Sequence, residues 1–340
     1  MNIQYTRSLK CRLLYIIALF LLPTSLLPGA ISAGAASEEQ DSITIAMEAT
    51  AVNTLIYVAH KQNFFADNGI RLIIKDHYPS GAAATEAMLS GEADLSTTAE
   101  FAIVRYAFAG RKICTLGSID RFMHMKLIAR ADGEIVTPKD FSGKRIGVAV
   151  GTAAEFNLGR FLDLQGLDKD SVIVEEVQAP DAVEAMTKGR VDALVTWQPY
   201  VLDISNTMGD AIQIWDVQSG QPMYCVLITS RKWSAAYPEL KKKFMNSLLQ
   251  AEQFLIENET QAQEIMQEFL GYDAEDIGTI WHQHRFSLRL DQSLILALED
   301  QARWMQKNIL HAEKSIPNFL EYIDTEGLEA VKPEAVSIIR

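Results

Sequence analysis

The stretch "SGAAATEAMLSGEAD" (residues 80–94) contains the start and the stop of one helix. Ser80 is a typical N-cap and Gly91 a typical C-terminal stop, so a helix is predicted between them. The first turn, Gly81 to Ala84, carries no acidic side chain that would meet the positive end of the helix dipole. Its free N–H groups could hold an external anion. The alternative is an ordinary helix whose small residues pack closely on a sheet, and this stretch alone favours that alternative.

The pattern A-x-E-A-M-x-x-G-x-x-D occurs twice, as "ATEAMLSGEAD" (84–94) and "AVEAMTKGRVD" (182–192). In each copy a predicted helix ends at the glycine and a strand begins near the final aspartate. A strand, a helix and a second strand are predicted before each copy, at 43–47, 53–62 and 70–75 and again at 145–150, 153–165 and 171–177. This alternation predicts two α/β units with parallel sheets and a cleft between them.

Ligands of open α/β sheets bind beyond the carboxyl ends of the strands, so the turns at those ends supply the candidate site. Helix starts at Gly81 and Gly151 are predicted to face each other across the cleft as a clamp for a small anion. Glu155 lies in the first turn of the second helix and would take part of its dipole. With the repeat taken into account, ligand binding becomes the favoured interpretation. The candidate ligand-binding residues are Thr50, Asn53, Ser80, Gly81, Thr97, Thr98, Glu100, Gly151, Thr152, Ala153 and Trp197.

Each polar candidate also has a structural interpretation. The threonines at 97–98 suit a strand end as well as a ligand. Glu100 would pair with a ligand amine, or would simply favour the start of the next helix. Trp197 would wall the pocket or pack beneath it. For Thr50 and Asn53, ligand contact and helix capping are both consistent with the sequence.

The amino-terminal segment has the parts of a secretory signal peptide. Arg7, Lys10 and Arg12 precede an apolar run at 13–22, and "AGA" at 33–35 fits a cleavage site. The run is too short for the roughly 20 residues of a membrane span. We therefore expect residues 1–35 to be removed and the mature protein to be soluble and periplasmic, with no membrane insertion.

Composition excludes some partners. The chain has 340 residues, of which 48% are hydrophobic. Removing the three basic residues of the signal segment leaves 28 basic and 44 acidic residues, a formal charge of −16. Such a surface repels nucleic acid and anionic membranes. Cys11 precedes the apolar run, so no lipid anchor is expected, and Cys114 and Cys225 are expected to be buried free thiols, with a disulfide as the alternative.

Three segments carry a resemblance to a known family: "LIYVAHKQNFFADNGIRLIIKDHYPSGAAATEAMLSGEADLS" (55–96), "DFSGKRIGVAVGTAAEFNLGRFLDLQGL" (140–167) and "MTKGRVDALVTWQPYV" (186–201). They resemble periplasmic substrate-binding proteins for sulfonates, taurine, nitrate and thiamine precursors. The resemblance implies a type II periplasmic binding protein fold, with two α/β lobes joined by two hinge strands and a closed form that docks on an ABC transporter permease. Lobe one would comprise 41–126 with 228–340, and lobe two 127–227. The segment "DRFMHMKL" (120–127) departs from the commoner pattern of the family.

The remaining sequence is predicted to be helical, at 238–258 and 290–308 with another helix within 271–284. His282 and His284 are interpreted as part of a solvated helix face rather than a metal pair.

The expected function is therefore a monomeric solute-binding component of an ABC import system, without catalysis, cofactor or metal. It would capture a small organic anion by closure of its two lobes. Glu100, if it faces the cleft, favours an amino-sulfonate over nitrate or a plain alkyl sulfonate. The alternatives are an exported ligand sensor that acts through a receptor and an enzyme similar to thiamine-pyrimidine synthases.

Overall fold

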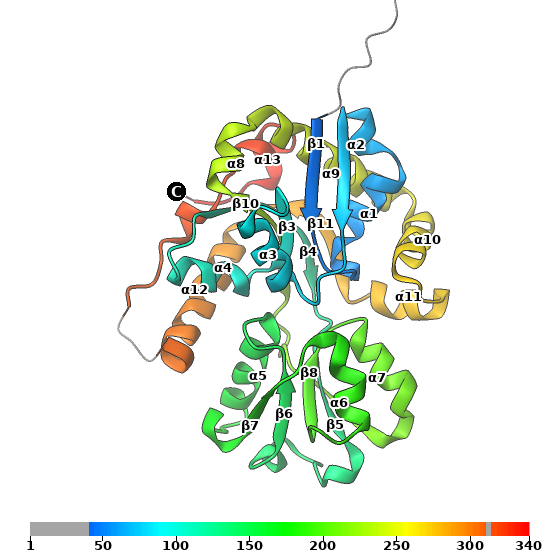
Figure 1. The fold of residues 1–340 in the computed structure, drawn as a ribbon, viewed down its shortest axis with the longest axis vertical. Helices are drawn as coiled ribbons and strands as arrows, with labels where there is room; N and C mark the ends of the chain where they lie inside the picture. The colour runs from blue at the N-terminus through cyan, green and yellow to red at the C-terminus, as the bar shows by residue number, and fades with distance from the viewer. Residues whose placement is uncertain (1–40, 311–313, 340) are drawn as a thin grey trace, which may run out of the picture. The chain divides into compact units, whose positions relative to one another are not determined.

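The computed structural model describes residues 41–310 and 314–339, so the predicted signal peptide lies outside the described residues. Two sheets, each covered by helices, make up this part of the chain (Figure 1). The mixed α/β architecture predicted from the sequence is confirmed.

The first sheet has six strands in the order β11-β4-β10-β3-β1-β2. Strand β1 is parallel to β2 and β3, whereas β10 runs antiparallel to β3 and β4, and β11 runs antiparallel to β4. The strands are β1 (Asp41–Ala46), β2 (Ile70–Lys75), β3 (Leu95–Ala99), β4 (Ile113–Phe122), β10 (Met223–Ser230) and β11 (His284–Arg289).

The second sheet has five strands in the order β7-β6-β8-β5-β9. Strand β6 is parallel to β7 and β8, and β5 is antiparallel to β8 and β9. The strands are β5 (Lys126–Arg130), β6 (Arg145–Val148), β7 (Ile173–Glu176), β8 (Ala193–Thr196) and β9 (Ile212–Asp216).

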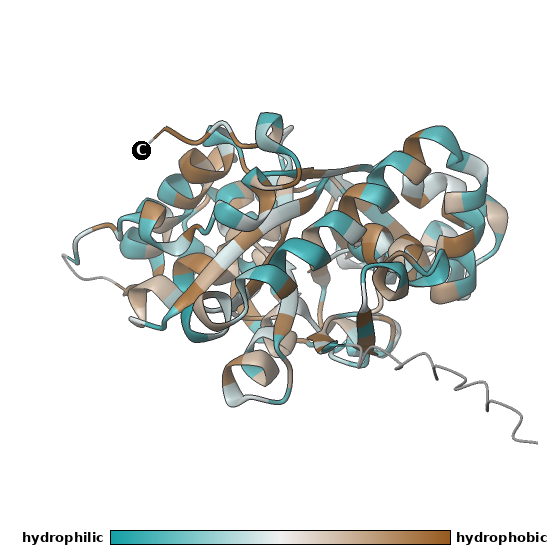
Figure 2. Ribbon diagram, turned by 90° about the horizontal axis from the view of Figure 1, so that it is seen from above, coloured by the Kyte–Doolittle hydropathy of each residue, from teal (hydrophilic) through white to brown (hydrophobic). Residues whose placement is uncertain are grey.

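Helices that carry an apolar face and a polar face cover both sheets (Figure 2). They are α1 (Thr54–Lys61), α2 (Phe64–Asp67), α3 (Gly81–Ser90), α4 (Phe101–Phe108), α5 (Ala153–Leu164), α6 (Ala182–Thr187), α7 (Tyr200–Met208), α8 (Arg231–Ala236), α9 (Pro238–Glu257), α10 (Glu259–Leu270), α11 (Ala274–Trp281), α12 (Gln292–Met305) and α13 (Glu326–Glu329). In the part of the chain that the structure describes, none of the helices has the length and apolarity to cross a membrane.

The repeated aspartate of the sequence pattern has the same role in both sheets. The carboxylate of Asp94 accepts a hydrogen bond from the backbone N–H of Thr44 in β1 at 2.8 Å. Asp192 accepts one from the backbone N–H of Arg145 in β6, also at 2.8 Å. Each aspartate thus ties a helix-to-strand turn to the neighbouring parallel strand. The repeat is therefore a packing unit of this fold.

The chain crosses between the sheets twice, through residues 123–125 and 217–222. Gln218 joins the two crossings, because its Nε2 donates to the Phe122 carbonyl at 3.0 Å and its Oε1 accepts from the Met125 N–H at 2.9 Å. The lobe boundaries expected at 126/127 and 227/228 stay a prediction.

The carboxyl-terminal region differs from the prediction in one element. The predicted helix within 271–284 is α11, which ends at Trp281, and the chain then forms strand β11 at the edge of the first sheet. The interpretation of His284 as part of a solvated helix face was wrong, because this side chain is buried on β11. His282 is exposed, as expected. Strand β11 is only half-buried, so its sequence lacks the apolar pattern that marks β1 or β3.

Candidate ligand pocket

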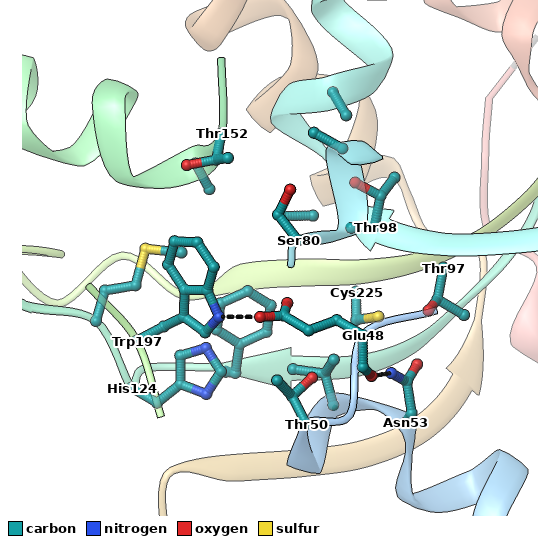
Figure 3. A pocket seen from close by; sticks show the side chains of 18 residues that line it. Glu48, Thr50, Asn53, Ser80, Thr97, Thr98, His124, Thr152, Trp197 and Cys225 are labelled. Atoms are coloured by element: carbon teal, nitrogen blue, oxygen red, sulfur yellow. Dashed lines mark hydrogen bonds between the residues drawn. The ribbon is translucent and has the colours of Figure 1, made fainter. Parts of the chain in front are cut away.

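A pocket lies between the carboxyl ends of strands from the two sheets (Figure 3). Its walls are apolar and its polar groups are mostly hydroxyls, a composition typical of small-molecule sites. No lysine or arginine lines this pocket. The lining residues are Glu48, Thr50, Val52, Asn53, Ser80, Gly81, Ala82, Thr97, Thr98, Ala99, Ala102, Phe122, His124, Met125, Thr152, Ala153, Trp197 and Cys225.

The structure brings together most of the residues that the sequence singled out. Those that line the pocket are Thr50, Asn53, Ser80, Gly81, Thr97, Thr98, Thr152, Ala153 and Trp197. Glu100 and Gly151 lie outside the lining set.

Helix α3 begins at the pocket wall. Ser80 is its N-cap, and the Ser80 Oγ accepts a hydrogen bond from the Ala83 N–H at 3.2 Å. The N–H groups of Gly81 and Ala82 have no acceptor within the helix, as at any helix start. A Cβ on Gly81 would lie 2.7 Å from the Cα of Thr98, so only glycine allows the helix to approach β3 this closely. Free N–H groups and the hydroxyls of Ser80 and Thr98 therefore share one end of the pocket.

Helix α5 begins at the opposite wall, but part of its start is already occupied. Thr152 is the N-cap, and its Oγ1 accepts from the Ala154 N–H at 3.2 Å. Glu155 accepts a hydrogen bond from the Gly151 N–H at 2.8 Å, while the Gly151 carbonyl accepts from Arg105 at 2.6 Å. These two bonds turn the peptide groups of Gly151 away from a ligand. The expectation that Gly151 offers a free N–H to an anion is therefore corrected, whereas Gly81 and Ala82 at the start of α3 keep N–H groups that are unpaired among the described residues.

The carboxylate of Glu100 does not face the cleft. It is fully buried and accepts hydrogen bonds from the Tyr224 N–H at 2.9 Å and from the Gln301 Nε2 at 2.8 Å. Burial outweighs these bonds and raises its pKa to about 7. The expectation that Glu100 points at a ligand amine is corrected, since its acceptor atoms already have protein partners.

Glu48 occupies the place in the pocket that Glu100 was expected to fill. It lies two residues beyond the end of β1, and its Oε1 accepts a hydrogen bond from the Trp197 Nε1–H at 2.9 Å across the two sheets (Figure 3). Tyr200 also hydrogen-bonds this carboxyl group. Burial raises the pKa of Glu48 to about 8, against the effect of both hydrogen bonds. The sequence contained the signal, because Glu48 stands at the carboxyl end of a predicted strand.

Two buried oxygens near Glu48 lack a hydrogen-bond partner among the described residues. They are the Thr50 Oγ1 and the Asn53 Oδ1. The Asn53 Nδ2 donates to the Glu48 carbonyl at 2.8 Å, which fixes the orientation of that side chain. Unpaired buried polar atoms cost free energy unless a ligand or water supplies the missing partner. They mark the Glu48 side of the pocket as a place for a polar ligand group.

His124 was not predicted as a site residue, and it enters the pocket from the first crossing between the sheets. Its Nδ1 lies 3.2 Å from the His284 Nε2, and the His284 Nδ1 lies 2.6 Å from the Asp120 Oδ2. Burial and the neighbouring His284 and Lys126 lower the pKa of His124 well below its ordinary value. A neutral imidazole therefore lines the pocket.

Comparison with known proteins places this chain in a family. The family described as "NMT1/THI5 like" matches residues 50–262, which is more than half of the chain. The chain belongs to the NMT1/THI5-like family.

Relatives within and around this family differ in what they do. The taurine-binding periplasmic protein of Escherichia coli is 25% identical over 232 residues, which are 63% of this chain and 70% of that protein. The alkanesulfonate-binding protein of Xanthomonas axonopodis, solved with bound MOPS, has a TM-score of 0.74 at 17% identity and covers 84% of this chain and 99% of that one. The desulfurization enzyme DSZB has a TM-score of 0.64 at 17% identity, with 86% and 99% covered. The solved structures confirm the periplasmic binding protein fold.

One protein of similar fold is an enzyme, so the reactivity of the nucleophilic side chains in this pocket bears on whether catalysis is feasible. Cys225 lines the pocket as a free buried thiol, whereas Cys114 is a free buried thiol elsewhere in the first sheet and does not line it. Burial and the carboxyl groups of Asp120, Glu100 and Glu48 raise the pKa of Cys225 well above its ordinary value. A reactive cysteine needs the opposite shift, toward the thiolate. Within the described residues, no cluster of His, Cys, Asp and Glu has the arrangement of a metal site.

Proposed function

We propose that this protein is the periplasmic solute-binding component of an ABC import system and that its ligand is a small amino-sulfonate. One observation carries the proposal: a single acidic group, Glu48, and the free N–H groups of α3 line the same pocket. This pattern fits a short ligand with an anionic end and an ammonium end. The names of the taurine-binding and alkanesulfonate-binding relatives support the same class of solute.

The anionic end would lie at the start of α3. The N–H groups of Gly81 and Ala82 and the hydroxyls of Ser80 and Thr98 are donors that suit sulfonate oxygens, and the helix dipole adds a favourable field. Such a site holds an anion without a lysine or arginine. The absence of a basic residue from the lining set favours a ligand that carries its own positive charge.

The ammonium end would lie at Glu48. Trp197 and Tyr200 both hydrogen-bond this carboxyl group, an arrangement that favours the ionised form. In the arrangement seen here, burial keeps the group protonated at neutral pH. An ammonium group would supply the missing charge, so ligand binding would release a proton from Glu48.

Closure of the two lobes would create these contacts. Residues 123–125 and 217–222 would act as hinges. Hydrogen bonds between the two sides include those of Glu48 with Trp197, Arg105 with the Gly151 carbonyl, and Tyr272 with Asp203 at 2.8 Å. A ligand that prefers the closed form shifts the population toward it. The closed monomer would then present both lobes to a permease.

An enzymatic role has less support, because Cys225 is held as a thiol and no other activated nucleophile lines the pocket. A binding panel with taurine, alkanesulfonates, nitrate and thiamine precursors tests the proposal. We expect taurine-like solutes to bind reversibly and to be recovered unchanged, as measured by mass spectrometry. Turnover of any bound solute would support the enzyme instead.

A further inference from the structure

Three buried residues form a hydrogen-bonded chain that ends in the pocket. Asp120 lies near the end of β4, His284 begins β11, and His124 lies in the crossing between the sheets. Asp120 is fully buried, and His124 and His284 are 2% and 8% exposed. This hydrogen-bonded chain joins residues 120–124, at the end of β4, to the edge strand β11.

The hydrogen bonds along this chain determine which ring nitrogen of each histidine carries a proton. The Asp120 Oδ1 accepts from the backbone N–H of Arg285 at 3.0 Å, so its other oxygen, Oδ2, is the acceptor for His284. A carboxylate in that position fixes the proton of His284 on Nδ1, as an aspartate fixes the tautomer of a catalytic histidine. In a neutral His284 the Nε2 is then an acceptor, and it would take a hydrogen bond from the Nδ1–H of His124, which lies 3.2 Å away.

With its proton on Nδ1, His124 carries no proton on Nε2. Among the residues that the structure describes, this nitrogen has no hydrogen-bond partner, although the ring lines the pocket. Burial, His284 and Lys126 all disfavour a second proton on the imidazole of His124. Glu48 and Cys225 are the other titratable groups of the lining set.

We propose that Asp120 and His284 hold His124 as a hydrogen-bond acceptor toward the ligand, which makes His124 a second recognition element for a donor group beside Glu48. The inference rests on the proposed function for the identity of the ligand. It assigns Asp120 and His284 as positioning residues and His124 as a specificity-determining residue. A plain alkanesulfonate has no donor for this nitrogen, so His124 discriminates against it.

Asp120→Asn tests this hydrogen-bonded chain because it should move the proton of each histidine from Nδ1 to Nε2. The amide oxygen would stay with the Arg285 N–H, which places the amide NH₂ against the His284 Nδ1. His284 would then carry its proton on Nε2, and so would His124, whose acceptor would become a donor. We expect taurine to bind about ten- to a hundredfold more weakly, the usual range for loss of a hydrogen bond to a charged group. Plain alkanesulfonates should not weaken.

The tautomers themselves are the direct readout, measured by nitrogen-15 NMR of the histidine rings in the ligand-free mature protein. We expect an unprotonated Nε2 on His124 in the parent and a protonated one in Asp120→Asn. A protonated Nε2 in the parent, or an unchanged tautomer in the variant, would overturn the inference. His124→Asn should lose taurine discrimination as well, whereas His282→Asn, at an exposed position, should change neither tautomer nor affinity.

The affinities for taurine and for plain alkanesulfonates distinguish a failure of the His124 inference from a failure of the proposed function. If the parent binds taurine but Asp120→Asn weakens taurine and plain sulfonates equally, the role of His124 is wrong while the proposed function stands. If the parent binds no amino-sulfonate, the proposed function fails, and the recognition role of His124 fails with it even if the NMR result is as expected.

Discussion

The indole N–H of Trp197 donates a hydrogen bond to the carboxyl group of Glu48 at 2.9 Å. Trp197 directly follows β8 of the second sheet, and Glu48 lies just after β1 of the first sheet. The contact therefore joins the two sides of the ligand pocket through the one acidic residue that lines it. Recognition of the ligand and closure of the pocket depend on the same carboxyl group.

Glu48→Gln should separate amino-sulfonates from plain sulfonates. The amide keeps an acceptor for Trp197 but cannot carry the negative charge that an ammonium group requires. We expect taurine affinity, measured by calorimetry, to fall about ten- to a hundredfold, with plain alkanesulfonates unchanged. Glu100→Gln is the matched control, a buried carboxyl group outside the pocket, and should affect both ligands alike. Equal losses for both ligands in Glu48→Gln would argue against ammonium recognition.

Gly81→Ala should weaken anion binding by displacing the start of α3. The new Cβ would meet the Cα of Thr98 at 2.7 Å, so the helix or the end of β3 must move. We expect taurine and plain sulfonates to lose affinity together, about tenfold or more. Gly278→Ala, in α11 with open space around the new Cβ, is the control and should leave binding unchanged. Parent-like affinity in Gly81→Ala would remove α3 from the site.

Stability of the ligand-free protein should fall as the pH rises from about 5 to 8. Burial raises the pKa of Glu48 to about 8 and that of Glu100 to about 7, from ordinary values near 4.5. Between these values the folded state binds more protons than the unfolded state, so the free energy of unfolding decreases with rising pH. The contribution is fully present below the unfolded pKa and is lost as the pH passes the folded pKa.

Thermal unfolding across this pH range checks the sign. Glu48→Gln combined with Glu100→Gln should flatten the decline of Tm by several degrees at the alkaline end. Glu268→Gln, which removes an exposed carboxylate, should not. A parent Tm that rises from pH 5 to pH 8, with the double variant following it, would contradict the assignment of these two groups.

Export should leave a mature protein that begins near Ala36 and carries no lipid. The expectation comes from the basic, apolar and small-residue parts of the first 35 residues and from Cys11, which precedes the apolar run. Intact-mass measurement of the protein from the periplasmic fraction tests it. A diacylglyceryl modification, or retention of the first residues, would refute it.

The sequence predicted the parallel strands and the helix starts well, because their signals are local. Ser80 and Gly91 are a cap and a stop, and the repeat that ends in Asp94 and Asp192 marks one packing unit used twice. Strand β11 was missed because it is an edge strand with a half-exposed pattern. Local sequence does not show which side of a strand end faces the cleft.

The position of the candidate site was also predictable, because the turns at strand ends have local sequence signals. Turns at strand ends identified Thr97, Thr98 and Trp197, since topology alone places such turns together. The acidic residue was misassigned, because only the fold shows that Tyr224 and Gln301 satisfy Glu100 while Glu48 meets the pocket. The link between His124 and His284 joins residues that are 160 positions apart.

Calorimetric titration of the mature protein with taurine at pH 7, in two buffers of different ionisation enthalpy, tests the central claim most directly. Burial raises the pKa of Glu48 to about 8, and an ammonium ligand would drive it to the carboxylate. We expect reversible binding of unchanged taurine with release of close to one proton, and no proton release when a plain alkanesulfonate is titrated. Taurine binding without proton release, or no binding of any amino-sulfonate, would contradict it.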